Sequence, residues 1–165
     1  MAVDRSVIGK PTGASRVTVE RGAVSTFAAA VTDDNPIFHD AGAARAAGFS
    51  AIPAPPTFTF AMRHAGAYAD EQPPDPTGGV NPMHQIMGEL HAQGALVLHG
   101  EQEFEYHRPV VVGDVLTGET RIVDIYEKDT DSATMTFVVM ATEWQDEGGS
   151  PVVTERFNLI ARLKK

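Results

Sequence analysis

"IPAPPTFTFAMRHAGAY", residues 52–68, is the stretch that decides how this sequence folds. It opens with three prolines and continues as a largely apolar segment. Pro56 suits the first turn of a helix, because the N–H that proline lacks has no partner there anyway. Phe58 and Met62 then share one face of that helix. The pattern predicts a helix over 56–68 that is buried on most of its sides.

Strand patterns dominate the second half of the sequence, from residue 95 onward. Four strands are predicted there, beginning near residues 96, 115, 132 and 151. The turns "KDTDS" and "DEGGS" separate the last long strands, which favours an antiparallel meander. Shorter alanine-rich segments at 21–31 and 41–47 are predicted helices, so helices come first and strands follow. This order predicts an α+β fold in which the sheet wraps around the apolar helix.

Length and composition place the chain among ordinary globular proteins. Its 165 residues suffice for a single domain, 1–165, and 42% of them are apolar. The formal net charge of −9 argues against a nucleic-acid binder or a protein held on anionic lipid. No stretch approaches about 18 uninterrupted apolar residues, and the first residues lack the apolar region of a secretion signal. We therefore expect a cytoplasmic protein with no membrane and no nucleic-acid partner.

The sequence contains no cysteine. This excludes disulfides, thiolate catalysis and cysteine-based zinc sites together.

The stretch "VTDDNPIFHD", residues 31–40, holds three aspartates, an asparagine, a proline and a histidine in ten positions. Pro36 pushes the preceding residue out of the α region and so ends the first helix, while Asp40 suits the N-cap of the next. A carboxylate and an imidazole on one rigid loop can hold a water molecule and move its proton. The alternative is a polar turn shaped by aspartate side chains. The candidate catalytic residues are Asp33, Asp34 and His39.

The stretch "HGEQEFEYH", residues 99–107, also carries many titratable groups. On a regular strand one face would hold His99, Glu101, Glu103, Glu105 and His107, and the other would hold Gln102, Phe104 and Tyr106. A metal site is one interpretation of the first face. A solvated or partner-facing polar side is favoured, because adjacent carboxylates repel unless they are hydrated or paired across an interface.

Three segments together resemble the MaoC-like hydratases and dehydratases: "DDNPIFHDAGAARAAGF", "APPTF" and "LHGEQEFEYHRPVVVGDVL". The similarity runs over about residues 8–163. It is nearest to the N-terminal-type half of the fused, fatty-acid-synthase-like members and to mycobacterial hydroxyacyl dehydratase subunits. The resemblance implies a hot-dog fold, in which a curved antiparallel sheet surrounds a central helix.

The same resemblance implies an activity and its partners. Members of the family add water reversibly across a trans-2-enoyl thioester of coenzyme A or acyl carrier protein, giving the (R)-3-hydroxyacyl product. Hot-dog chains usually pair, so a homodimer or a heterodimer with a second hot-dog subunit is expected. The resemblance implies no metal and no cofactor.

Catalytic members of the family carry an Asp-x-Asn-Pro-aliphatic-His pattern in the polar turn. A gapless alignment places Phe38 where the histidine belongs, and His39 follows one residue late. A one-residue insertion would instead give Asp34 and His39 the familiar Asp-x₄-His spacing. The gapless alignment is preferred because it also aligns Asp40 with an acidic residue that often follows. In the gapless alignment, Asp33, Asn35 and Pro36 match the aspartate, asparagine and proline of the family pattern.

Expected substrate contacts are Asn35, Pro56, Thr57 and Arg108. Arg63 and Arg108 are the candidates for contact with a phosphopantetheine or nucleotide phosphate. Three functions remain open: a hydratase/dehydratase component, a non-catalytic subunit that shapes the acyl channel of a partner, and a hot-dog thioesterase. Phe38 favours the second, and the enoyl-hydratase type of turn argues against the third.

Overall fold

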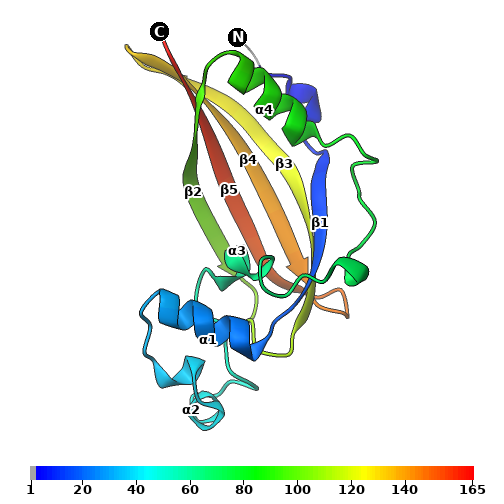
Figure 1. The fold of residues 1–165 in the computed structure, drawn as a ribbon, viewed down its shortest axis with the longest axis vertical. Helices are drawn as coiled ribbons and strands as arrows, with labels where there is room; N and C mark the ends of the chain where they lie inside the picture. Colours follow the sequence, from blue (N-terminus) through cyan, green and yellow to red (C-terminus); the bar gives the residue numbers. More distant parts are fainter. Residues whose placement is uncertain (1–2) are drawn as a thin grey trace.

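A curved antiparallel sheet of five strands forms the body of the protein (Figure 1). The computed structural model describes residues 3–165. The strands lie in the order β1-β3-β4-β5-β2, and β3, β4 and β5 form the predicted antiparallel meander. Their bounds are β1 (Pro11–Thr18), β2 (Leu96–Tyr106), β3 (Val115–Asp129), β4 (Ala133–Gln145) and β5 (Pro151–Lys164).

The helices lie at the two ends of this sheet. In Figure 1, α1 and α2 lie beyond one end, α4 lies across the opposite end, and α3 crosses the sheet near α1. The α-helices are α1 (Arg21–Ala30), α2 (Ala41–Ala46), α3 (Phe58–Met62) and α4 (Pro82–Ala92). Short 3₁₀ helices occur at Arg5–Val7, Pro36–Phe38 and Ala69–Glu71. The α+β hot-dog fold expected from the sequence is confirmed.

Helix α3 is buried as predicted but much shorter than predicted. Phe58 and Met62 are only 2% and 1% exposed. They pack in one cluster with Trp144, Leu116 and Val153 of the sheet. The predicted helix over 56–68 was wrong in length, because α3 has only five residues.

Backbone geometry and a close tertiary contact explain the short helix. Thr57, which precedes it, adopts the left-handed conformation (φ 68°), so Pro56 lies outside the helix. After the helix, the N–H of Thr18 donates to the carbonyl of Gly66 at 2.9 Å. A Cβ at Gly66 would lie 2.1 Å from the Thr18 oxygen. Only glycine permits β1 to approach this closely, and the chain leaves the helix to make the contact.

Two hydrophobic clusters cover the concave face of the sheet. The first joins α1 and α3 to the half of the sheet near Trp144. The second joins α4, through Ile86 and Leu90, to Ile122 and Val138 of the sheet. A five-residue helix spans about 7.5 Å, whereas β3 has 15 residues. The far end of the face is therefore covered by α4.

Strand β2 contains a bulge that changes which face its side chains occupy. The register shifts between His99 and Gln102, and a Cβ at Gly100 would lie 2.7 Å from the Ile160 side chain. A bulge inserts an extra residue, so the alternation restarts beyond it. His99 therefore packs on Phe157 of the concave face, with ring centroids 4.4 Å apart. The prediction that His99 shares a face with Glu101 and Glu103 was wrong.

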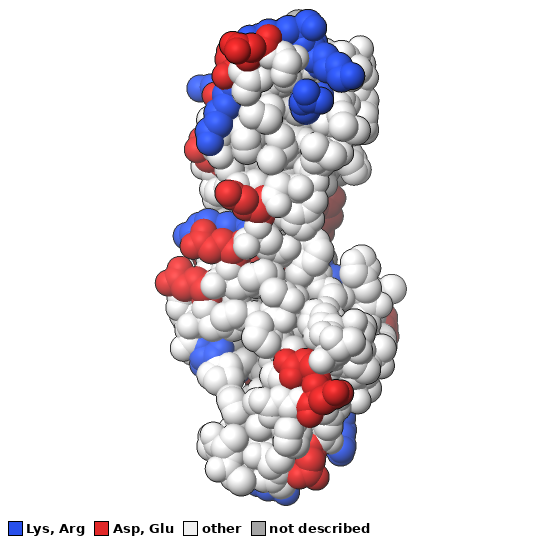
Figure 2. Space-filling model, turned by 90° about the vertical axis from the view of Figure 1, so that its left-hand side faces the viewer, with Lys and Arg blue, Asp and Glu red and all other residues white. Residues whose placement is uncertain are grey.

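The β2 side of the molecule combines an open sheet edge with apolar side chains. Strand β2 ends the sheet, and Leu96, Leu98 and Tyr106 are more than 40% exposed. Figure 2 faces this side, and uncharged atoms occupy much of its middle. An exposed strand edge with apolar side chains is a surface suited to pairing with another chain.

Packing of Trp144 on β3 gives a test of the fold. A Cβ at Gly118 would lie 2.5 Å from the Trp144 ring. Gly118→Ala is expected to lower the free energy of unfolding by about 1–3 kcal/mol, because the core there has no room. Urea unfolding measures the loss. Gly22→Ala in α1, where a Cβ meets nothing within 4 Å, is the control and should not destabilise the protein. Equal stability of both variants would contradict this packing.

Candidate functional site

The polar turn between α1 and α2 is held by its own side chains. Asp33 Oδ1 accepts from the Asn35 N–H at 3.1 Å, and Asn35 Oδ1 accepts from the Ile37 N–H at 3.2 Å. Asp40 caps α2 as predicted, accepting from the Ala43 N–H at 2.7 Å. Each bond satisfies a backbone donor that the adjoining helical turn leaves free. The side chains of Asp33, Asn35 and Asp40 therefore shape the turn.

His39 contacts the backbone of this turn. Its Nε2 lies 3.0 Å from the carbonyl oxygen of Asp33, and the ring is half-buried. Asp34 is exposed, whereas Phe38 is 7% exposed and points inward. The His39 ring therefore contacts the backbone carbonyl of Asp33, and the Asp34 carboxylate lies in solvent.

A hollow of about 450 Å³ lies beside the turn. Phe38, Phe49, Pro56, Tyr106, Arg108 and Val110 are among the residues that line it. The Tyr106 hydroxyl accepts from the Thr57 N–H at 3.0 Å, which ties the strained backbone at Thr57 to β2. Of the expected substrate contacts, Pro56 and Arg108 line this hollow and Thr57 adjoins it. Asn35 belongs to the turn itself.

Arg108 is held by two carboxylates at the rim of this hollow. Its guanidinium lies 2.7 Å from Asp114 Oδ2 and 3.6 Å from Asp146 Oδ2. The hydrogen bond to Asp114 raises the pKa of Arg108, and partial burial opposes that effect. Asp114 Oδ2 also accepts from the Val111 N–H at 2.9 Å. A phosphate that bound Arg108 would therefore compete with carboxylates that already neutralise its charge.

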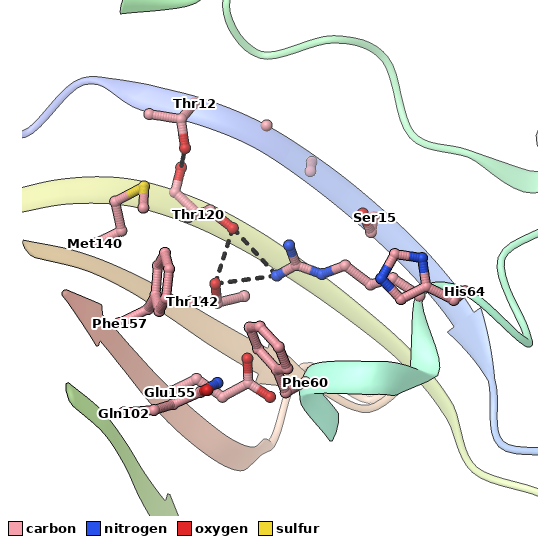
Figure 3. Close-up of a pocket in the computed structure, with 13 residues that line it drawn as sticks. Thr12, Ser15, Phe60, His64, Gln102, Thr120, Met140, Thr142, Glu155 and Phe157 are labelled. Atoms are coloured by element: carbon pink, nitrogen blue, oxygen red, sulfur yellow. Dashed lines mark hydrogen bonds between the residues drawn. The ribbon is translucent and has the colours of Figure 1, made fainter. Parts of the chain in front are cut away.

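A second hollow, of about 360 Å³, opens on the concave face between the two hydrophobic clusters (Figure 3). A row of polar side chains crosses β3, β4 and β5 there, because Thr120 pairs with Thr142 and Thr142 pairs with Glu155. Arg63, just after α3, donates to the Thr120 and Thr142 hydroxyls at 3.3 and 3.1 Å. The hydroxyls lie 2.8 Å from each other. This polar row was not recognised in the sequence.

Burial dominates the electrostatics of this second hollow. Glu155 is 5% exposed, and burial raises the pKa of its carboxyl, opposed by Thr59, Arg63 and Trp144. Burial also lowers the pKa of Arg63, and the Glu155 charge opposes that effect. The guanidinium carbon lies 5.0 Å from the centroid of the Trp144 ring, a distance suited to a cation–π contact.

The sequence does carry a signal for Glu155. In "PVVTERFNLIARL" the alternate positions Val153, Phe157, Leu159 and Ala161 are apolar, and glutamate occupies the remaining one. A charged residue on the buried face of a strand needs a partner. That reasoning would have singled out Glu155.

Two further classes of site can be addressed for residues 3–165. Within that range no helix is long and apolar enough to cross a membrane. In the same part of the chain, His, Asp and Glu side chains form no group of three that could hold a metal ion.

The chain belongs to a family of dehydratase regions. The family described as "FAS1-like, dehydratase domain region" matches residues 6–155. A UPF0336 protein of Streptomyces avermitilis is 35% identical over 165 residues, covering 98% of this chain and 97% of the relative. A probable enoyl-CoA hydratase alpha subunit of Thermomonospora curvata is 30% identical over 132 residues, covering 79% of this chain and 41% of that protein.

Solved structures agree with this assignment. A chain of the ChsH1-ChsH2 complex from Mycobacterium tuberculosis superposes with a TM-score of 0.70 at 26% identity, covering 92% of this chain and 86% of that one. A MaoC-like dehydratase superposes with a TM-score of 0.66 at 26% identity, covering 94% of this chain and 42% of that one. The protein is therefore a hot-dog chain of the MaoC-like hydratase and dehydratase type.

Glu155→Gln tests the electrostatics of the second hollow. A carboxyl whose pKa is raised on folding contributes stability below its ordinary pKa of 4.5, and that contribution is lost as pH rises through the raised value. Glutamine avoids the cost of the buried charge. We expect Glu155→Gln to raise Tm at pH 7 by roughly 2–4 °C for each kcal/mol gained.

The gain should shrink as the pH is lowered toward 4.5, and thermal unfolding across this range measures it. The control is Glu103→Gln, an exposed glutamate on β2. A loss of stability in Glu155→Gln at neutral pH would show that the charge pairing with Arg63 outweighs the cost of burial.

Proposed function

We propose that this protein is a component of an (R)-specific enoyl-thioester hydratase, or 3-hydroxyacyl-thioester dehydratase, that acts on acyl-CoA or acyl carrier protein. The observation that carries the proposal is the polar turn of residues 33–39 beside an apolar hollow of about 450 Å³. The family to which the chain belongs, and the T. curvata relative named as a probable enoyl-CoA hydratase alpha subunit, support it.

The reaction needs a proton acceptor, a proton donor and an apolar space. In hydration, a base removes a proton from water, the oxygen bonds to C3, and a proton is delivered to C2. Dehydration runs the same steps in reverse. Phe38, Phe49 and Val110 offer apolar walls for an acyl chain, and we assign the rim at Arg108, which Asp114 and Asp146 hold in place, to the polar end of the thioester.

A second candidate is a non-catalytic subunit that shapes the acyl channel of a catalytic partner. Two observations favour it. Phe38 is buried and lines the hollow, where the gapless alignment places the histidine of catalytic members. The His39 ring is directed to the carbonyl of Asp33, which leaves no carboxylate–imidazole pair around a water position. In this arrangement the acid–base pair belongs to the second chain.

The β2 side is the surface that we assign to this partner. Leu96 and Leu98 are 56% and 43% exposed on the edge strand. The backbone groups of an edge strand remain free to pair with a strand of another chain. A second hot-dog chain, identical or different, would extend the sheet and cover these side chains.

Hydration of crotonyl-CoA, followed by the loss of absorbance of the conjugated thioester, tests the proposal. We expect little or no hydration by this chain alone. Addition of a hot-dog chain with a complete Asp-x-Asn-Pro-x-His turn should produce activity, which His39→Ala in this chain should change less than about tenfold. Loss of a general acid or base costs about 10²–10⁴-fold.

Two other outcomes are decisive in this assay. Hydration by the isolated chain that His39→Ala reduces by about 10²-fold or more would assign catalysis to this turn. Asp33→Asn and Asp34→Asn would then identify the participating carboxylate. Absence of hydration with every partner and chain length, together with release of free thiol from acyl-CoA, would replace the proposal with a thioesterase.

Leu98→Lys tests the partner surface. Sedimentation of the wild type should show a species larger than the 17.7 kDa chain, either alone or with the second hot-dog chain. Leu98→Lys should weaken that assembly, because burying an unpaired ammonium in an interface is unfavourable. Val80→Lys, at a loop residue that is 74% exposed, is the matched control. Equal assembly of both variants would exclude the β2 side.

A further inference from the structure

The hollow on the concave face is separate from the polar turn and has a chemistry of its own. Pro56, before α3, borders the hollow beside the turn, whereas Phe60 and Arg63, at the other end of α3, border the hollow on the sheet. None of the residues that line one hollow lines the other. The helix therefore divides the two spaces.

Among residues 3–165, four buried polar atoms make no hydrogen bond of ordinary length, and two of them, on Gln102 and Glu155, belong to residues that line this second hollow. The four atoms are Thr59 Oγ1, Gln102 Nε2, Trp144 Nε1 and Glu155 Oε1. A buried polar group that is left unpaired destabilises the fold. Thr59, Trp144 and Glu155 are at least 95% buried, so bulk solvent does not reach them freely.

The sheet register brings these four groups to one place. Glu155 pairs with Thr142 on β4, and Trp144 is the next inward position along that strand. On the other side, Glu155 pairs with Phe104 of β2, and Gln102 is the next inward position there. Thr59, on α3, and Trp144 lie close enough to lower the pKa of the Glu155 carboxyl, and neither of them lines the hollow. Gln102 Nε2, a donor, and Glu155 Oε1, an acceptor, are therefore the two unpaired atoms that a molecule in the hollow could reach.

Part of the lining is apolar, whereas Thr12, Ser15, Arg63, His64, Thr120 and Thr142 add further polar groups. Phe60 and Phe157 contact each other at its edge, with ring centroids 6.0 Å apart, and Met140 lies on the adjacent strand (Figure 3). Phe60 is 45% exposed although it is a large apolar side chain. Glu155 and Gln102 thus share the hollow with an apolar surface formed by Phe60, Phe157 and Met140.

The charges around the hollow determine which polar group a bound molecule can carry. Arg63 and Glu155 carry opposite formal charges, and Arg63 is already held by the Thr120 and Thr142 hydroxyls. A carboxylate or phosphate would approach the Glu155 carboxylate and be repelled. A hydroxyl both accepts and donates, so it can satisfy Gln102 Nε2 and Glu155 Oε1 together.

We propose that this hollow is a binding site for an apolar molecule that carries a hydroxyl group, such as a medium-length aliphatic alcohol. The hydroxyl accepts from Gln102 and donates to Glu155, and the aliphatic part packs against the surface formed by Phe60, Phe157 and Met140. The inference is independent of the proposed hydratase function, since it uses neither the polar turn nor its hollow.

Trp144 supplies a direct test, because it is the only tryptophan in the sequence. The full chain is titrated with 1-octanol, with 1-chlorooctane, which lacks the hydroxyl, and with octanoate, while tryptophan emission is recorded. We expect a saturable change with 1-octanol at about tenfold lower concentration than with either comparison compound, which corresponds to one or two hydrogen bonds. No enzymatic activity enters this measurement.

Gln102→Leu identifies the site. The variant should weaken 1-octanol binding by about tenfold and leave 1-chlorooctane binding unchanged, because it removes a donor and keeps a similar volume. Glu103→Gln, at the next residue and on the opposite face of β2, should change neither. Gln102→Met serves the same purpose if the leucine variant does not fold.

Three results would overturn the proposal. Equal binding of 1-octanol and 1-chlorooctane would show an apolar cleft only. Tighter binding of octanoate would show that the Arg63 charge dominates the site. Absence of any saturable change in tryptophan emission would show that the hollow does not bind these molecules.

Discussion

The packing of α3 against Trp144 on the concave face is the contact on which the rest of this structure depends. Phe58 and Met62 bury one end of the face, and Gly118 lets the indole lie flat on β3. Because α3 has only five residues, it cannot cover strands of eleven to fifteen residues. The fold therefore needs α4 at the other end, and a band between the two clusters remains open to ligands.

The same short helix separates the two candidate sites. Its N-terminal side, at Pro56 and Thr57, adjoins the hollow beside the polar turn, and its C-terminal side carries Phe60 and Arg63 to the concave face. Arg63 reaches across to β3 and β4 through two threonine hydroxyls. Changes in the packing of α3 would therefore alter both spaces at once, whichever of them binds the acyl chain.

In the polar turn, side chains that are candidates for proton transfer also hold the backbone in place. Asp33 and Asp40 both accept backbone N–H groups, so substitutions there affect the turn as well as any proton transfer. Phe38 packs inward and His39 turns to a carbonyl. These contacts are consistent with a chain whose main contribution is shape, with the reacting groups supplied by a partner.

The sequence alone determined the α+β layout, the meander, the burial of Phe58 and Met62 and the cap at Asp40, because each of these follows from local periodicity, proline or side-chain hydrogen bonding. The motifs of three segments also indicated the family.

Other features needed the tertiary structure. The bulge in β2 moved His99 to the concave face, since alternation along a strand cannot reveal an extra residue. The length of α3 was set by the approach of Thr18 to Gly66, residues 48 positions apart in the chain. The site around Glu155 depends on the register of β2, β4 and β5, and strand register is decided by contacts between segments that are distant in the sequence.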